Sequence, residues 1–178
     1  MYTYCLFCET GKCDTLAKLF EIRFPCRAIS PKQVQHTWSK KQKAVDRVHD
    51  LLPGYLFLYF EDEKPNISQF WGMNGMIKCL SGKDEEYKRY ELSGSDEAFA
   101  MTILQHDGVI GKTQVYQEGD RIRIRSGVFE GLATRILKVD RRSSRMQIEI
   151  PFANQLIKTW VEYEIVEPEN DQGATASN

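Results

Sequence analysis

The most apolar stretch of the chain reads Leu51-Leu52-Pro53-Gly54-Tyr55-Leu56-Phe57-Leu58-Tyr59-Phe60. Its Pro-Gly pair predicts a bend. The unbroken apolar run after the bend predicts a strand whose neighbours bury both of its faces. We therefore expect this strand to lie at the centre of a sheet.

The residues before this stretch predict a strand, a helix and a hairpin. Residues 3–8 are rich in aromatic and small apolar side chains, which favours a buried strand. A helix follows, with Asp14 as its cap, Pro25 as its end, and an apolar face made of Leu16, Leu19, Phe20 and Phe24. Two further strands, at 28–34 and 44–48, flank a basic tip at 39–43, so we expect a hairpin that stands in solvent.

The residues after this stretch complete a mixed α/β sandwich. Residues 66–71 predict a short helix after Pro65, and residues 76–80 predict another strand. Ser95 is placed as the cap of a second helix, whose Phe99 and Ile103 face the sheet. The first 106 residues are thus expected to form one domain of helices packed on a sheet.

A different pattern begins beyond residue 106. Residues 107–116 contain two glycines and little periodicity, which predicts a linker. From Arg121 strict alternation sets in, and short strands are predicted at 136–139, 146–150 and 157–161. We expect a small five-stranded β-barrel over 117–168, a disordered tail over 169–178, and an α+β chain overall.

Charge is distributed unevenly along the chain. The net charge is −1, yet residues 121–145 carry +6 and the remainder carries −7. Alternation predicts that Arg121, Arg123 and Arg125 share one side of a strand. Arg141, Arg142 and Arg145 are expected to crowd the loop after Val139-Asp140. Two clusters of arginine on a small barrel suit binding to phosphates.

Two motifs in this order resemble the NusG family of transcription elongation factors. Residues 51–58 are similar to the Pro-Gly-Tyr strand of the family's N-terminal domain, called NGN. Residues 118–124 with 126–131 and Val139-Asp140 are similar to the opening of its C-terminal KOW motif, an SH3-like barrel. The resemblance covers nearly the whole chain up to Val166.

This resemblance implies a factor that binds bacterial RNA polymerase and catalyses no reaction. In the family an apolar concavity of the N-terminal domain takes up a helical hairpin of the polymerase, and Phe7, Leu52 and Tyr55 match positions in or near it. The same side chains are equally suited to an ordinary core. Lys40, Lys41 and Lys43 at the hairpin tip are candidates for contact with non-template DNA. The alternative is that they only form a solvated face.

The basic barrel is more similar to that of the specialised LoaP branch, whose members are antiterminators of long operons and bind an RNA hairpin. On this interpretation the RNA-binding residues are Arg121, Arg123, Arg125, Lys138, Arg141, Arg142 and Arg145. Three alternatives stay open: arginines that only confer solubility, a general NusG-type factor whose barrel binds a protein, and a translation-associated RNA-binding protein.

The remaining residues do not favour catalysis or cofactor binding. Cys5 and Cys8 are expected on opposite faces of a strand, and no cysteine pair or close histidine completes a metal site, so we expect reduced thiols and no disulfide, metal or cofactor. A Cys–His nucleophile using His36, His49 or His106 stays formally open. Without a signal-like start or a membrane-length apolar run, we expect a cytoplasmic monomer.

Overall fold

The structure is a computed structural model that describes residues 1–38, 44–81, 90–118, 121–130 and 132–166. It is a mixed α/β structure with two α-helices and twelve strands in these ranges. Lys40, Lys41 and Lys43 at the expected hairpin tip and the expected tail at 169–178 lie outside the described residues.

A four-stranded sheet forms the N-terminal half. Its order is β2-β5-β1-β6, with bounds β1 Tyr2–Cys8, β2 Arg27–Ile29, β5 Tyr55–Phe60 and β6 Met76–Cys79. Every residue of β5 is buried, which confirms the prediction of a central strand. The strand starts at Tyr55 because Gly54 makes the turn before it. Gly54 has φ +87°, and a Cβ there would lie 3.1 Å from the carbonyl oxygen of Cys8.

Helix α1 (Cys13–Arg23) and a short 3₁₀ helix, η1 (Ile67–Phe70), cover one face of this sheet. Phe20 and Phe70 meet edge to face, with ring centroids 5.2 Å apart. Two expectations about α1 were wrong. Asp14 lies in the first turn and does not cap the helix, because Lys12 holds the cap position without a side-chain hydrogen bond. Leu19 is 39% exposed, since the buried stripe is narrower than predicted.

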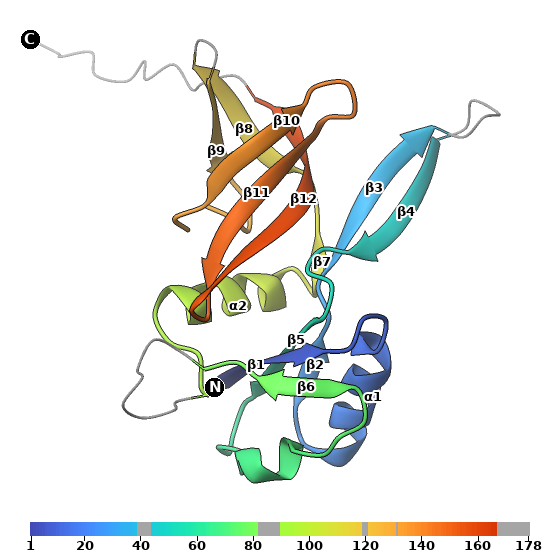
Figure 1. The fold of residues 1–178 in the computed structure, drawn as a ribbon, viewed down its shortest axis with the longest axis vertical. Coiled ribbons are helices and arrows are strands. Elements are labelled where there is room, and N and C mark those ends of the chain that lie inside the picture. The colour runs from blue at the N-terminus through green and yellow to red at the C-terminus, as the bar shows by residue number, and fades with distance from the viewer. Residues whose placement is uncertain (39–43, 82–89, 119–120, 131, 167–178) are drawn as a thin grey trace, which may run out of the picture.

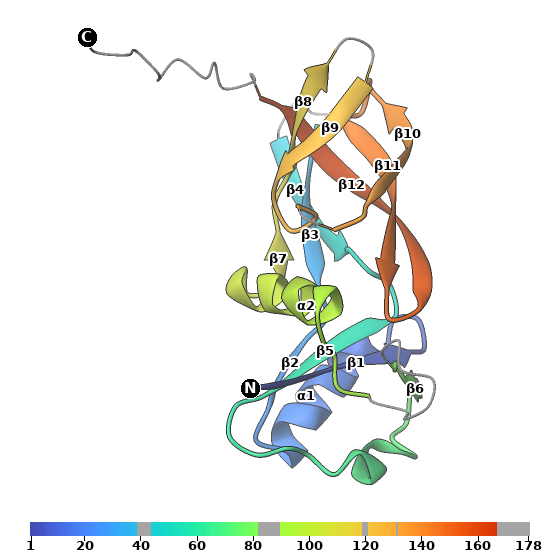
Figure 2. The same ribbon diagram turned by 90° about the vertical axis from the view of Figure 1, so that its left-hand side faces the viewer.

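Helix α2 (Ser95–Gln105) covers the opposite face of the sheet. Phe99 and Ile103 are buried as expected, and the Tyr59 hydroxyl donates a 2.7 Å hydrogen bond to the carbonyl of Ala100. The prediction that Ser95 caps this helix was wrong, because Gly94 takes the cap position and Ser95 is the first helical residue. In Figures 1 and 2, α2 lies between the four-stranded sheet and the strands of the C-terminal half.

The predicted hairpin is present as β3 (Lys32–Trp38) and β4 (Ala44–Asp50), which pair antiparallel with Val34 opposite Val48. The prediction of one strand over 28–34 was wrong, because residues 27–29 form β2, which pairs with β5 in the four-stranded sheet. Figure 1 shows the hairpin extending away from the N-terminal half. Strand β7 (Val109–Ile110) pairs with β3 to complete a three-stranded sheet. Residues 107–116, expected to be a linker, therefore contain β7 and the beginning of the next strand.

The C-terminal sheet, as we call strands β8–β12, has the order β10-β11-β12-β8-β9. The bounds are β8 Thr113–Glu118, β9 Arg121–Ser126, β10 Arg135–Asp140, β11 Arg145–Phe152 and β12 Gln155–Ile165. Strand β8 was not predicted. In β9 the register shifts, since Val115 pairs with Ile124 but Gln114 pairs with Ser126. Arg125 is thus the extra residue of a bulge, and the predicted strict alternation fails there.

The turn between β11 and β12 joins the two halves. Phe152, at its start, is 2% exposed and packs with ring centroids 5.5 Å from Phe57 on β5 and 5.6 Å from Phe99 on α2. Ala153 and Asn154 form the turn with φ 46° and 61°. A positive φ is unfavourable for alanine. The Ala153 N–H donates to the buried Asp96 carboxylate at 3.1 Å, which favours this conformation.

Two further hydrogen bonds link the halves. The Thr159 hydroxyl on β12 donates to the carbonyl of Leu51 at 2.6 Å, and the backbone N–H of Glu162 donates to the Gln33 side chain at 3.4 Å. The apolar side chains around them form one continuous cluster that runs from β5 through α2 into the C-terminal sheet. The two halves therefore share a core.

This packing predicts a large effect of Phe152→Ala. Removing a buried phenyl ring leaves a cavity between Phe57 and Phe99, so the free energy of unfolding falls by about 3 kcal/mol in urea titrations. Leu156→Ala is the matched control on the same hairpin, because Leu156 is 65% exposed. It changes the unfolding free energy by less than about 0.5 kcal/mol. Equal losses from the two variants would contradict the docked arrangement.

Candidate nucleic-acid and partner interfaces

The turn between β10 and β11 presents two arginines on a fixed backbone. Asp140 accepts hydrogen bonds from the backbone N–H groups of Arg142 and Ser143, at 3.0 and 3.3 Å, and from the Ser143 hydroxyl at 2.7 Å. The hydrogen bonds from Ser143, followed by the backbone hydrogen bond and the positive charge of Arg142, lower the pKa of Asp140. The turn is thereby held in one shape, and Arg141 and Arg142 stand exposed on it.

Arg145 differs from these two arginines because it is partly buried. Its guanidinium lies over the indole ring of Trp160, 5.6 Å from the ring centroid. Its Nε atom is shielded from solvent and has no hydrogen-bond partner in the described part of the chain. Trp160 was not among the predicted site residues. The sequence feature that indicates it is a large aromatic residue at an outward position of the strand, between the inward residues Thr159 and Val161.

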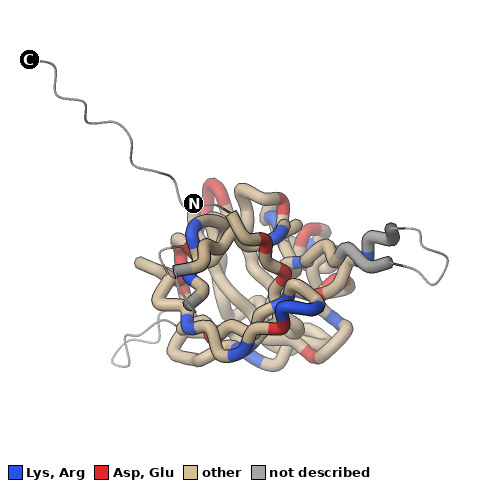
Figure 3. The backbone as a smooth tube through the Cα atoms, turned by 90° about the horizontal axis from the view of Figure 1, so that it is seen from above, with Lys and Arg blue, Asp and Glu red and all other residues tan. Residues whose placement is uncertain are grey.

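The arginines of β9 and the lysine of β10 differ in their exposure to solvent more than predicted. Arg123 and Lys138 are exposed, whereas Arg125 is partly buried at the bulge. The side chain of Arg121 lies outside the described residues. Seen from above in Figure 3, Lys and Arg positions are interspersed with Asp and Glu positions. The structure therefore brings the predicted basic residues onto the strands and turns of one sheet.

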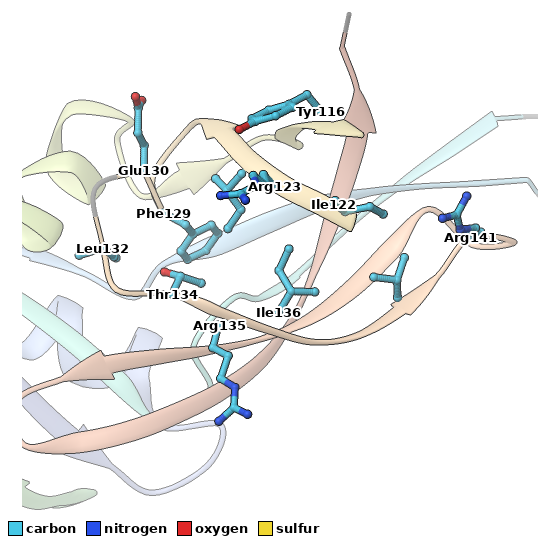
Figure 4. Close-up of a pocket in the computed structure, with 12 residues that line it drawn as sticks. Tyr116, Ile122, Arg123, Phe129, Glu130, Leu132, Thr134, Arg135, Ile136 and Arg141 are labelled. Carbon is cyan, nitrogen blue, oxygen red and sulfur yellow. The ribbon is translucent and has the colours of Figure 1, made fainter. Parts of the chain in front are cut away.

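A groove of about 770 Å³ lies between β9 and β10, the two edge strands of the C-terminal sheet. Its apolar lining consists of Tyr116, Ile122, Ile124, Phe129, Leu132, Ile136 and Val139. Arg123, Arg135 and Arg141 also line it, so members of both predicted arginine clusters meet here. In Figure 4, Phe129 and Ile136 point into the groove and Arg141 lies at its end. Arg135 was not among the predicted site residues.

The residues expected to contact RNA polymerase lie at the junction of the two halves. Leu52 is fully buried and Tyr55 is 8% exposed, and both belong to the apolar cluster that contains Phe152 and Ile157. Phe7 is only partly buried, and its ring meets that of Tyr55 at 5.3 Å. In this conformation Leu52 and Tyr55 belong to the core that the two halves share, and Phe7 packs against it.

The other reactive side chains form no metal site in the ranges that the structure describes, where no group of three or more His, Cys, Asp or Glu side chains is placed to hold an ion. All five cysteines are free thiols. Cys5 and Cys8 do lie on opposite faces of β1, as predicted, since each belongs to a different apolar cluster. Neither described helix has the length and apolarity needed to cross a membrane.

Comparisons with known proteins give a resemblance in shape to solved structures. No protein-family model matches the chain, and no curated protein matches it. A solved structure of NusG from Thermotoga maritima, determined in a study of domain interaction, matches 90% of this chain and 93% of its own length. The TM-score is 0.47 and the sequence identity is 13%. These values do not assign the chain to a family.

Proposed function

We propose that this protein is a NusG-type transcription elongation factor that binds bacterial RNA polymerase through its N-terminal half and promotes antitermination of long operons. Its C-terminal sheet binds a hairpin in the nascent RNA, in the manner of the LoaP branch. Support for the family comes from the two motifs at 51–58 and 118–131, which occupy the β5 turn and strand and the β9 region. The proposed role is binding, without a catalysed reaction.

The observation that carries the RNA-binding proposal is the ordered turn at 140–143. A structured RNA is recognised largely through phosphates and 2′-hydroxyls, so a rigid display of cations favours it over an unstructured basic tail. Arg141 and Arg142 are exposed on that turn, and Arg123 reaches the groove that Arg141 also lines. Lys138 and Arg145 extend the basic positions along the neighbouring strands, as does Arg121 by sequence.

The polymerase-binding proposal rests on Phe7, Leu52 and Tyr55, and it requires the two halves to separate. An apolar receptor for an amphipathic helix must be open to solvent. Leu52 and Tyr55 share a core with the C-terminal sheet in the conformation described here. The proposal therefore includes an open form in which the β11–β12 hairpin leaves Phe57 and Phe99.

A second candidate function is supported by the groove between β9 and β10. Its apolar lining and its position between the two edge strands of the sheet suit a segment of another protein better than RNA. In that case the protein is a general NusG-type factor whose C-terminal sheet binds a protein partner. Binding of RNA hairpins distinguishes the two functions.

Titration of the full-length protein with hairpins from the leaders of long operons tests the RNA proposal. For a preferred hairpin, replacing Arg141 and Arg142 by alanine weakens binding at least about tenfold and lowers the salt slope by about two, because two phosphate contacts are lost. The matched control replaces Lys18 and Arg23, two exposed basic residues on α1. It leaves the affinity unchanged. Equal losses in both variants would refute a specific site.

In the same titration, Asp140→Ala distinguishes an effect of the shape of the turn from an effect of its charge. The substitution removes a negative charge, so simple electrostatic attraction predicts tighter binding. The loss of three hydrogen bonds to Asp140 lets the turn change shape. If RNA binding depends on the fixed positions of Arg141 and Arg142, it becomes weaker. We expect weaker binding to the hairpin. Tighter binding, or equal binding to duplex DNA and scrambled RNA, would instead favour a non-specific basic surface.

Retention on immobilised bacterial RNA polymerase tests the other half of the proposal. Phe152→Asp places a charge where the ring packs between Phe57 and Phe99, which favours the open form. We expect this variant to be retained several-fold more than the native chain, and Tyr55→Ala to remove the gain. Leu156→Asp is the control, because it adds the same charge at an exposed position. If Phe152→Asp is retained no better than this control, the polymerase site is elsewhere.

A further inference from the structure

A pocket of about 470 Å³ lies in the N-terminal half, between β1, η1 and the segment that leads into α2. The letter N in Figure 1 marks the beginning of β1, close to this pocket. Ile67, Tyr90 and Leu92 give it an apolar wall, and Tyr4 lines it from β1. None of its described lining residues belongs to the groove between β9 and β10 or to the turn at 140–143. Cavities of this size commonly bind small molecules.

The wall contributed by residues 90–92 is held in place by printed contacts on both of its sides. The backbone N–H of Leu92 donates to the carbonyl of Thr3 at 2.8 Å, which fixes this segment against β1. The ring of Tyr90 meets that of Trp71 edge to face, with centroids 5.8 Å apart. The apolar wall therefore exists before any ligand binds.

Tyr4 brings a hydroxyl group without a partner to this pocket. Tyr4 is 1% exposed, and its ring packs edge to face against Phe60 and Phe70, with centroids 5.9 and 6.1 Å away. Its hydroxyl is shielded from solvent and has no hydrogen-bond partner among the described residues. Burial, followed by the negative charge of Glu91, raises the pKa of Tyr4 to about 12, so the hydroxyl keeps its proton at neutral pH. A buried donor of this kind calls for an acceptor.

The charged residues at the pocket favour a ligand with N–H groups. Lys64 pairs with Glu91 at 2.6 Å and lies over the ring of Tyr2, 5.8 Å from its centroid. Glu97, partly buried in the first turn of α2, adds a second carboxylate to the lining. One ammonium group against two carboxylates leaves the pocket negative. It therefore attracts hydrogen-bond donors and repels phosphate groups.

We propose that this pocket binds a small uncharged heteroaromatic amine of the purine type. A ring nitrogen of the ligand accepts the hydrogen bond from the Tyr4 hydroxyl, the amine donates to Glu97, and the ring packs against Tyr90 and Ile67. A free base or nucleoside fits this description. A nucleotide or a nucleic-acid strand brings phosphates toward the two carboxylates. The inference does not depend on binding of RNA or polymerase.

Calorimetric titration of the full-length chain with adenosine tests the inference directly. We expect a dissociation constant below about 1 mM, as for a small ligand that fills a preformed pocket. Inosine, which has an oxygen in place of the amine, and adenosine 5′-monophosphate, which adds a phosphate, each bind at least about fivefold more weakly. Absence of adenosine binding, or equal binding of the monophosphate, would overturn the proposal.

Variants of the two polar residues locate the binding site. Tyr4→Phe weakens adenosine binding at least about fivefold and leaves the midpoint of urea unfolding unchanged, because the hydroxyl has no partner to lose. Glu97→Ala removes the preference for adenosine over inosine. Tyr116→Phe is the matched control on the C-terminal sheet and leaves the affinity unchanged. Unchanged affinity in Tyr4→Phe, or a lower unfolding midpoint, which would reveal a partner within the protein, would contradict the assigned role.

Discussion

The packing of Phe152 against Phe57 and Phe99 is the contact on which the arrangement of this molecule depends. Phe57 lies on the central strand β5, Phe99 on α2, and Phe152 at the end of β11, so three parts of the chain meet in one aromatic cluster. The hydrogen bond from Ala153 to Asp96 fixes the same turn beside it. The hydrogen bonds from Thr159 to Leu51 and from Glu162 to Gln33 support the same arrangement of the two halves.

This contact also determines which surfaces the protein offers. In the docked form the C-terminal sheet shares a core with Leu52 and Tyr55, and the basic turn at 140–143 and the groove between β9 and β10 remain accessible. Under the proposed function the docked form binds RNA or a protein segment through those accessible surfaces. Under the same proposal the polymerase-binding residues Leu52 and Tyr55 become available only after undocking. The cost of exposing Phe152 and its neighbours then sets how readily the factor engages polymerase.

Local sequence patterns predicted the strands well, because apolar runs and alternation reflect burial directly. The central strand β5 and the β3–β4 hairpin follow from such patterns. Helix starts were less accurate, since Asp14 and Ser95 are good caps by residue type while the backbone places Lys12 and Gly94 at the cap positions. The bulge at Arg125 depends on the partner strand β8, which had no clear pattern of its own.

The candidate sites were predictable only in part. The arginine-rich segment was evident from charge, but the meeting of Arg123 and Arg141 in one groove depends on the pairing order of five strands. The stacking of Arg145 on Trp160 joins residues that only the register of β11 and β12 brings together. The docking of Phe152 is a contact across almost a hundred residues, which no local pattern encodes.

Amide hydrogen exchange with and without bacterial RNA polymerase tests the central claim most directly. The Ala153 amide is the reporter, because its hydrogen bond to Asp96 exists only while the halves are docked. The account predicts that Ala153 is protected in the free protein and loses protection in the polymerase complex, while the amides of β5 stay protected. Continued protection of Ala153 in that complex, or the absence of a complex, would contradict it.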